Sequence, residues 1–121
     1  MMADLMKGEK GMNSAKGSKI IADFSIIPVG HGETSIGRYV AVAIAATNKV
    51  SGLKYEITPM GTVMEAENLE TILEAVKVAH EALFAKGIAR VESTLRIDDR
   101  RDKPRTMKDK VDSVKKYIKQ L

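Results

Sequence analysis

Residues 53–66 carry the clearest alternation of apolar and polar side chains in the chain. Leu53, Tyr55 and Ile57 share one parity while the residues between them are polar, which predicts a half-buried strand. Pro59 cannot donate to a strand ladder, and the glycine at position 61 accepts backbone angles that other residues resist. We therefore predict a β-hairpin with a tight turn at 59–62 and a second strand over 62–66.

Residues 19–29 and 88–100 predict two further strands. In the first, Ile20, Ala22, Phe24 and Ile26 form an apolar row, whereas the other row mixes isoleucines with Asp23 and Ser25. In the second, apolar residues alternate with charged and hydroxyl residues. One face of each strand is thus suited to packing beneath helices.

Helical spacing of apolar residues fills the segments between these strands and follows the last one. Residues 34–51 predict a helix that Thr34 or Ser35 can cap and Gly52 can end. Asn68 is a second cap, and its helix continues to Gly87. After Pro104, the pair Thr106 and Asp109 resembles a capping box, and a final helix carries a narrow apolar stripe suited to packing on a neighbour.

This order of elements predicts an α+β fold, a ferredoxin-like βαββαβ sandwich with an extra C-terminal helix and a four-stranded antiparallel sheet. Two helices cover only one face of such a sheet. The opposite face needs another subunit, the extra helix or a ligand to cover it. On the predicted parities that face carries Asp23, Ser25, Glu56, Thr58, Thr94 and Arg96.

Length and composition are those of one globular domain. We assign residues 19–121 to it and expect residues 1–18 to form a disordered tail. The chain has no cysteine, which excludes disulfides and thiolate metal sites, and the absence of an export signal predicts a cytoplasmic protein. No apolar run approaches the ~20 residues of a membrane span. Sixteen acidic residues offset the 20 basic ones and aromatics are few, which argues against nucleic-acid binding.

The loop at 30–35 is the first candidate site. Its free N–H groups and the hydroxyls of Thr34 and Ser35 could hold an anion at the positive end of the following helix, although a simple turn and cap is the favoured interpretation. It has neither a dinucleotide fingerprint nor a P-loop. An acylphosphatase would need an arginine in this loop, and Arg38 falls inside the predicted helix.

No other pattern predicts catalysis or a metal. His31 and His80, the chain's two histidines, lack partners at metal-ligand spacing, and no nucleophile elbow surrounds a serine. We expect no catalytic residue, metal or cofactor. The charge run 98–104 alternates in sign, which is typical of a solvated, self-paired segment but also suits a subunit contact or a cationic ligand.

Three longer segments together resemble a known family. IADFSIIPVGHGETSIGRYVA, GLKYEITPMGTVMEA and STLRIDDRRDKPRTMKDKVDSV are similar to the small thiamine-binding, YkoF-like ferredoxin-fold proteins, and the resemblance begins at Lys19. It implies a cytoplasmic, non-catalytic homotetramer, assembled through its sheets, that binds thiamine or a related hydroxymethylpyrimidine near subunit contacts.

Thiamine joins a flat aminopyrimidine to a cationic thiazolium, so its site needs hydrogen-bonding groups, apolar walls and a carboxylate. We expect the ligand-binding residues to be Asp23, Ser25, Thr34, Ser35, Tyr39, Glu56, Thr58, Met60, Gly61, Thr62 and Asp98. The alternative hypothesis is a structural or regulatory homo-oligomer that binds phosphate or sulfate at a helix N-terminus.

Overall fold

The computed structural model describes residues 18–121, so the predicted tail lies outside the described residues apart from Ser18. The element order is strand, helix, strand, strand, helix, strand, helix, as predicted. The elements are β1 (Ile20–Val29), α2 (Gly37–Ala46), a 3-10 turn η1 (Thr47–Lys49), β2 (Lys54–Thr58), β3 (Gly61–Ala66), α3 (Leu69–Ala85), β4 (Arg90–Asp99) and α4 (Met107–Ile118).

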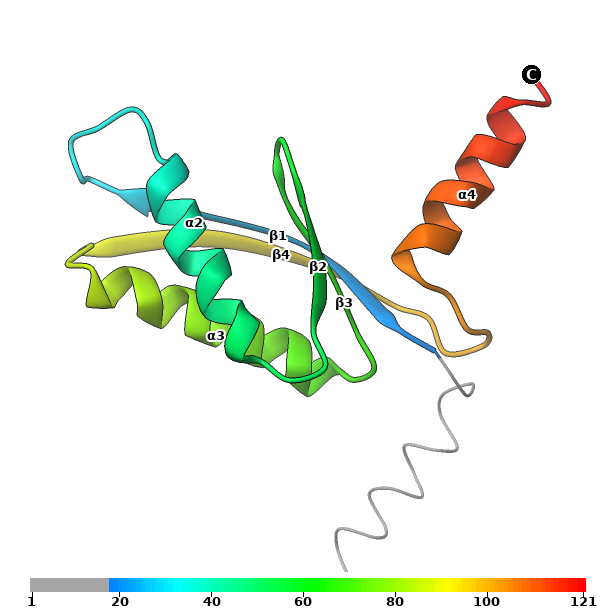
Figure 1. Cartoon of the computed structure of the whole chain (residues 1–121), viewed down its shortest axis with the longest axis horizontal. Helices are drawn as coiled ribbons and strands as arrows, with labels where there is room; N and C mark the ends of the chain where they lie inside the picture. Colours follow the sequence, from blue (N-terminus) through cyan, green and yellow to red (C-terminus); the bar gives the residue numbers. More distant parts are fainter. Residues whose placement is uncertain (1–17) are drawn as a thin grey trace, which may run out of the picture.

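The four strands form one antiparallel sheet in the order β2-β3-β1-β4. This confirms the ferredoxin-like fold. Helices α2 and α3 lie together on one face of the sheet, while α4 stands apart on the opposite side, beyond the end of β4 (Figure 1). The face that α2 and α3 leave uncovered is called the open face below.

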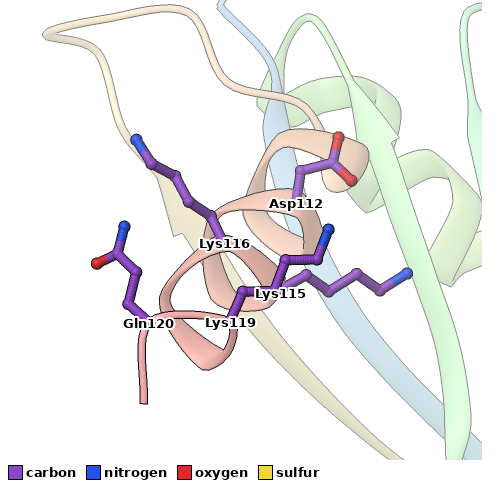
Figure 2. Close-up of a pocket in the computed structure, with 5 residues that line it drawn as sticks. All are labelled: Asp112, Lys115, Lys116, Lys119 and Gln120. Carbon is purple, nitrogen blue, oxygen red and sulfur yellow. The ribbon is translucent and has the colours of Figure 1, made fainter.

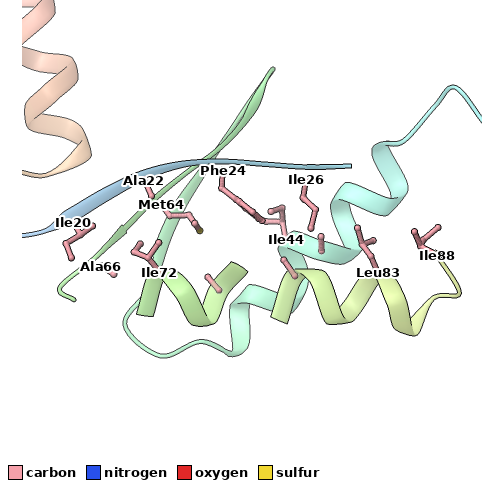
Figure 3. Packing of buried hydrophobic residues seen from close by; sticks show 13 residues of the cluster. Ile20, Ala22, Phe24, Ile26, Ile44, Met64, Ala66, Ile72, Leu83 and Ile88 are labelled. Atoms are coloured by element: carbon pink, nitrogen blue, oxygen red, sulfur yellow. The ribbon is translucent and has the colours of Figure 1, made fainter. Parts of the chain in front are cut away.

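The core lies between the sheet and the two helices. The apolar row predicted for β1 is confirmed, because all four of its side chains are buried (Figure 3). Antiparallel pairing sets Ala22 opposite Met64, and side chains that are opposite one another share a face. Helix α3 covers this row with its own buried residues, Ile72, Ala75, Ala79 and Leu83.

Helix α2 is shorter than the pattern predicts, and the predicted N-caps Thr34 and Ser35 are wrong, although Gly52 does adopt the predicted positive φ, at 83°. Its first backbone hydrogen bonds run from Tyr39 and Val40 to the carbonyl of Ile36, so Thr34 and Ser35 lie too far upstream to cap it. Gly30 has a positive φ of 79°, and the loop that it opens continues to Ile36. The 3-10 turn then replaces the last predicted helical turn.

The other helix ends follow their sequence signals. The Asn68 side chain accepts a hydrogen bond from the Thr71 N–H, at 2.9 Å, and Gly87 ends α3 with a φ of 87°. Thr106 and Asp109 form a complete capping box at the start of α4. Local hydrogen bonding therefore fixes both ends of α3 and the start of α4.

The β2–β3 hairpin is confirmed, but Gly61 is needed there for a different reason from the one that the sequence suggests. Its φ is not positive. Instead, a Cβ atom at position 61 would lie 2.9 Å from the Phe24 carbonyl oxygen and 3.4 Å from Asp23 Oδ1. The absence of a side chain lets β3 approach β1 closely at this point.

Candidate functional site

The open face presents the polar row that the strand parities predict. Register places Asp23 between Val63 of β3 and Arg96 of β4, and it sets Ser25 opposite Thr94. Glu56 lies on the same face because it pairs with Val63. The open face is therefore a mixed surface in which carboxylates and cations surround isolated apolar side chains.

A groove of about 670 Å³ crosses this face. Each strand contributes to it, and so does one residue of α4. The lining residues are Ile21, Ala22, Asp23, Thr58, Val63, Arg96, Ile97, Asp98 and Lys110. The volume is within the range of about 300–1,000 Å³ that small-molecule sites occupy.

Two ion pairs flank the groove, and they differ in tightness. Lys110 Nζ lies 2.5 Å from Asp98 Oδ2, whereas Arg96 Nη2 lies 3.8 Å from Asp23 Oδ2. The Asp23 side chain is about half exposed and the Arg96 side chain is 84% exposed. Of the two carboxylates, Asp23 is thus the more available to an incoming cation, because its present partner is more distant and more solvated.

The first residue of helix α4 is attached to the sheet by a buried contact, although the rest of the helix stands apart. The Met107 N–H donates to Glu65 Oε1 at 2.8 Å, and both residues are buried. This N–H belongs to the first turn of the helix, where backbone donors have no partner within the helix. The carboxylate also lies at the positive end of the helix dipole. Glu65 therefore positions α4, and with it Lys110, at the groove.

Glu65→Ala is expected to loosen α4. The buried Met107 N–H loses its acceptor, which costs about 1–3 kcal/mol. Hydrogen exchange should accelerate over 107–118 and change little in α3. The matched control is Glu67→Ala, since Glu67 is 75% exposed and pairs with Lys19 at the surface; its expected cost is below about 1 kcal/mol. Equal protection of α4 in both variants would contradict the role of Glu65.

Three of the predicted ligand residues, Asp23, Thr58 and Asp98, line the groove. The Thr58 hydroxyl is partly engaged in the hairpin, because it donates to the Gly61 carbonyl at 2.9 Å and accepts from the Gly61 N–H at 3.1 Å. Its remaining capacity is as an acceptor. Ser25 and Glu56 lie on the same face outside the lining, and Met60 lies at the hairpin tip with 89% of its surface exposed.

The structure does not bring Thr62 or Tyr39 to the groove. Thr62 pairs with Phe24 and Ile57, so its side chain lies on the covered face, where only 3% of its surface is exposed. Tyr39 belongs to α2 and packs against the core on that same side. Thr62 and Tyr39 were both predicted to share a pocket with Asp23, but the sheet lies between these two side chains and the groove.

Thr34 and Ser35 lie in the exposed loop before α2, also away from the groove. Next to them, Arg38 pairs with Glu33 and lies 5.0 Å from the Tyr39 ring centroid. The His31 ring meets the Tyr39 ring edge-on at 4.9 Å. The Arg38 cation in this loop is therefore already paired with the Glu33 carboxylate and with the Tyr39 ring, which leaves it less available to an anion.

Most of the charge run 98–104 is self-paired, as the alternation predicts. Arg101 donates two hydrogen bonds to Asp99, and this contact holds the pKa of the Asp99 carboxyl below its ordinary value. Arg100 lowers the pKa of Asp102 in the same way. Asp98 is the exception, because its partner is Lys110 of α4.

Helix α4 also carries a hollow of about 470 Å³ on its outer side (Figure 2). One helical segment and the residues that follow it supply the whole lining, which consists of Asp112, Lys115, Lys116, Lys119 and Gln120. Since no second element forms an opposing wall, these lysines are best described as a solvated helix face.

Residues 18–121 contain neither a metal-binding cluster nor a membrane-spanning helix. No cluster of three or more His, Cys, Asp or Glu side chains could hold a metal ion there. No helix in that part of the chain has the length and apolar character needed to cross a bilayer. His80 instead contacts Ser93 Oγ through its Nε2 at 2.6 Å.

Six lining residues were absent from the predicted ligand residues: Ile21, Ala22, Val63, Arg96, Ile97 and Lys110. The parity of β3 could have indicated Val63, and the mixed row of β1 already contained Ile21. Lys110 had no such signal, because its place depends on how α4 returns to the sheet through residues 100–106.

A ferredoxin-like sheet with one open, charged and grooved face is the architecture of a small-ligand-binding or self-associating domain. The sequence matches the thiamine-binding protein family over residues 22–115. The chain belongs to this family.

This chain matches similar proteins over almost their whole length. A UPF0045 protein of Methanothermobacter thermautotrophicus is 50% identical over 99 residues, which cover 82% of this chain and 99% of that protein. The UPF0045 protein YqgV of Bacillus subtilis is 43% identical over 101 residues, covering 81% and 96%.

Solved structures agree on the fold. The hypothetical protein MJ1052 of Methanocaldococcus jannaschii superposes with a TM-score of 0.72 at 41% identity, covering 80% of this chain and 96% of that one. A Thermotoga maritima protein whose proposed role is thiamine biosynthesis or salvage has a TM-score of 0.63 at 25% identity, covering 79% and 98%.

Proposed function

We propose that the groove on the open face binds thiamine or a related hydroxymethylpyrimidine, and that the protein neither makes nor breaks bonds in the ligand. The observation that carries this proposal is the loosely paired carboxylate of Asp23 beside the half-buried apolar side chain of Val63. Family membership and the proposed salvage role of the Thermotoga maritima protein support the same ligand class.

The chemistry of the groove matches the two halves of thiamine. The thiazolium cation is attracted to a carboxylate whose own partner lies 3.8 Å away, so little existing contact is lost when it binds. The flat pyrimidine packs on the half-buried aliphatic side chain of Val63. Its amino group can donate to the Thr58 hydroxyl, which retains acceptor capacity after its two contacts with Gly61.

Calorimetric titration with thiamine tests the site. We expect saturable binding that weakens at least about tenfold in Asp23→Asn, because a charge-assisted contact is lost. Asp102→Asn is the control, since it is the same chemical change outside the groove at a residue that pairs with Arg100; its affinity should match the unmodified protein. Equal affinities in the two variants would place the ligand elsewhere.

A second pair of variants tests which face holds the ligand. Thr58→Val removes the groove hydroxyl and should weaken binding, whereas Thr62→Val alters only the covered face and should not. If Thr62→Val weakens binding more, the open-face site is wrong.

Thermal unfolding with added phosphate or sulfate distinguishes thiamine binding from the rival anion-binding function, because a ligand stabilises the folded state that it binds. Stabilisation by these anions and not by thiamine would favour an anion site at α2.

The biological role that fits such a groove is that of a carrier or sensor in the cytoplasm. Self-association as a homotetramer is part of the proposal. It is supported by the open sheet face and by the apolar row of α4, in which more than half of the surface of Val111, Val114 and Ile118 is exposed.

A further inference from the structure

A second, smaller hollow adjoins the groove near the start of β1. Its volume is about 80 Å³, and it shares Ile21, Asp98 and Lys110 with the groove. Three segments meet there, namely the start of β1, the end of β4 with the loop that follows it, and α4. The lining residues are Lys19, Ile21, Asp98, Arg100, Arg105 and Lys110. This hollow is called the cationic pocket below.

Four cationic side chains line the cationic pocket, and its carboxylate already has a partner. Lys110 Nζ lies 2.5 Å from Asp98 Oδ2, so this pair contributes little net charge. Lys19 and Arg100 also form ion pairs, but their carboxylate partners lie outside the lining. These two pairs are at the surface, where each contributes only about 0–1 kcal/mol. Because like charges repel one another, an anion is the ligand that this lining attracts.

Arg105 is the unpaired cation of the cationic pocket. Within residues 18–121 no carboxylate pairs with it and no side-chain hydrogen bond engages its guanidinium, although the residue is half-buried. Arg100 and Arg101, in the same charge run, each donate two hydrogen bonds to a carboxylate. A guanidinium that is partly removed from water and has no such partner is available for a two-point contact with an anion.

The size of the cationic pocket suits a single phosphate group. Its volume of about 80 Å³ is roughly half that of the cavity of about 150 Å³ that holds a six-membered aromatic ring, so it is too small for the rings of thiamine. A phosphate monoester carries a charge of about −1.5 to −2 at pH 7 and three acceptor oxygens, which suits two guanidinium and two ammonium groups. A carboxylate offers one charge and two oxygens, and it would leave more of these donors without an acceptor.

The cationic pocket lies within reach of a ligand in the groove. Register sets Ile21 opposite Asp98, and Asp23 lies two residues further along β1 on the same face. Two residues of an antiparallel strand span about 7 Å. The thiazolium ring of thiamine carries a two-carbon arm that ends in a hydroxyl group, and phosphate esters form at that hydroxyl. A thiazolium ring held at Asp23 can therefore place an ester phosphate in the cationic pocket.

We propose that the preferred ligand is a phosphate monoester of the thiamine or hydroxymethylpyrimidine class, and that the cationic pocket binds its phosphate group. This inference rests on the proposed function, because it assigns a further part of the same ligand. Arg105 forms the two-point contact with the phosphate, and Lys110 lies between the phosphate and the groove because it lines both hollows. The unphosphorylated compounds bind less tightly, since they place no anion among these cations.

Calorimetric titration with thiamine, thiamine monophosphate and inorganic phosphate tests this preference, at low salt because ions screen exposed charges. We expect the monophosphate to bind at least about tenfold more tightly than thiamine, since its phosphate adds charge-assisted hydrogen bonds. Equal affinities for these two compounds would overturn this inference alone, whereas binding of neither would overturn the proposed function as well. Inorganic phosphate that binds as tightly as the monophosphate would indicate a site for free phosphate and would also overturn the inference.

Arg105→Gln tests whether the cationic pocket is responsible. The substitution removes the charge and keeps a polar side chain, so affinity for thiamine monophosphate should fall at least about tenfold. Affinity for thiamine should stay unchanged, which also shows that the variant is folded. Arg90→Gln is the control, because Arg90 is exposed at the other end of β4, and it should alter neither affinity. A monophosphate affinity that falls equally in both variants, or in neither, would overturn the inference.

Discussion

Replacing Phe24 with alanine is expected to lower the free energy of unfolding by about 3–5 kcal/mol. Phe24 lies at the middle of β1, has only 1% of its surface exposed, and contacts the core on the central strand of the sheet. Truncation removes apolar burial and leaves a cavity beneath α2 and α3 that a close-packed interior fills only in part. Urea denaturation followed by circular dichroism measures the change.

Phe84→Ala is the matched control, because the chain has two phenylalanines and Phe84 is 49% exposed. It should cost far less, on the order of 1 kcal/mol, since its ring is only half removed from water. Both variants are compared at the same low protein concentration, so that self-association does not contribute. Similar losses from the two substitutions would mean that Phe24 is not the centre of the core.

Gly61→Ala is expected to destabilise the protein by about 1–3 kcal/mol, although it adds a single methyl group. The new Cβ would lie 2.9 Å from the Phe24 carbonyl oxygen, which belongs to the backbone of the central strand. Neither atom can move without shifting a strand, so the hairpin must separate from β1. Because the methyl group also approaches Asp23 Oδ1 at 3.4 Å, thiamine affinity should fall together with stability.

The corresponding control is Gly37→Ala. A Cβ atom there meets no atom within 4 Å, and Gly37 is the first residue of α2. Alanine is the better helix former, so this variant should be neutral or stabilised by up to about 1 kcal/mol. The melting temperature of Gly61→Ala should therefore fall, whereas that of Gly37→Ala should rise or stay unchanged. A Gly61→Ala protein with unchanged stability would contradict the close approach of β3 to β1.

The sequence predicted the architecture well because one simple period governs each element. Alternation in β1 separated the buried row around Phe24 from the row around Asp23, and a strand of this kind can turn only one row toward the helices. Once the parities were set, the composition of the open face followed. The capping signals at Asn68 and Thr106 were also reliable, because they depend on residues within one turn, whereas those at Thr34 and Ser35 failed because α2 begins further along the chain.

The groove was less predictable, because it depends on contacts between distant segments. Thr62 was expected beside Thr58, but the two-residue turn sets Thr58 opposite Gly61 and thereby turns Thr62 to the covered face. Tyr39 carries an aromatic ring that suits a ligand, yet helix placement decided its side of the sheet. Lys110 reaches Asp98 only because α4 is anchored through Met107 and Glu65. No local sequence pattern encodes the return of α4 to the sheet.

The position of β1 between β3 and β4 has a consequence for synthesis of the chain. The first residues of β1 and β4, Ile20 and Arg90, are 70 positions apart, since 90 − 20 = 70. At roughly 5–20 residues per second, β4 leaves the ribosome about 4–14 s after β1. During that interval the nascent sheet has no β4 beside its central strand, and the apolar row of β1 lies next to an open edge. We expect the growing chain to be prone to aggregation during this period.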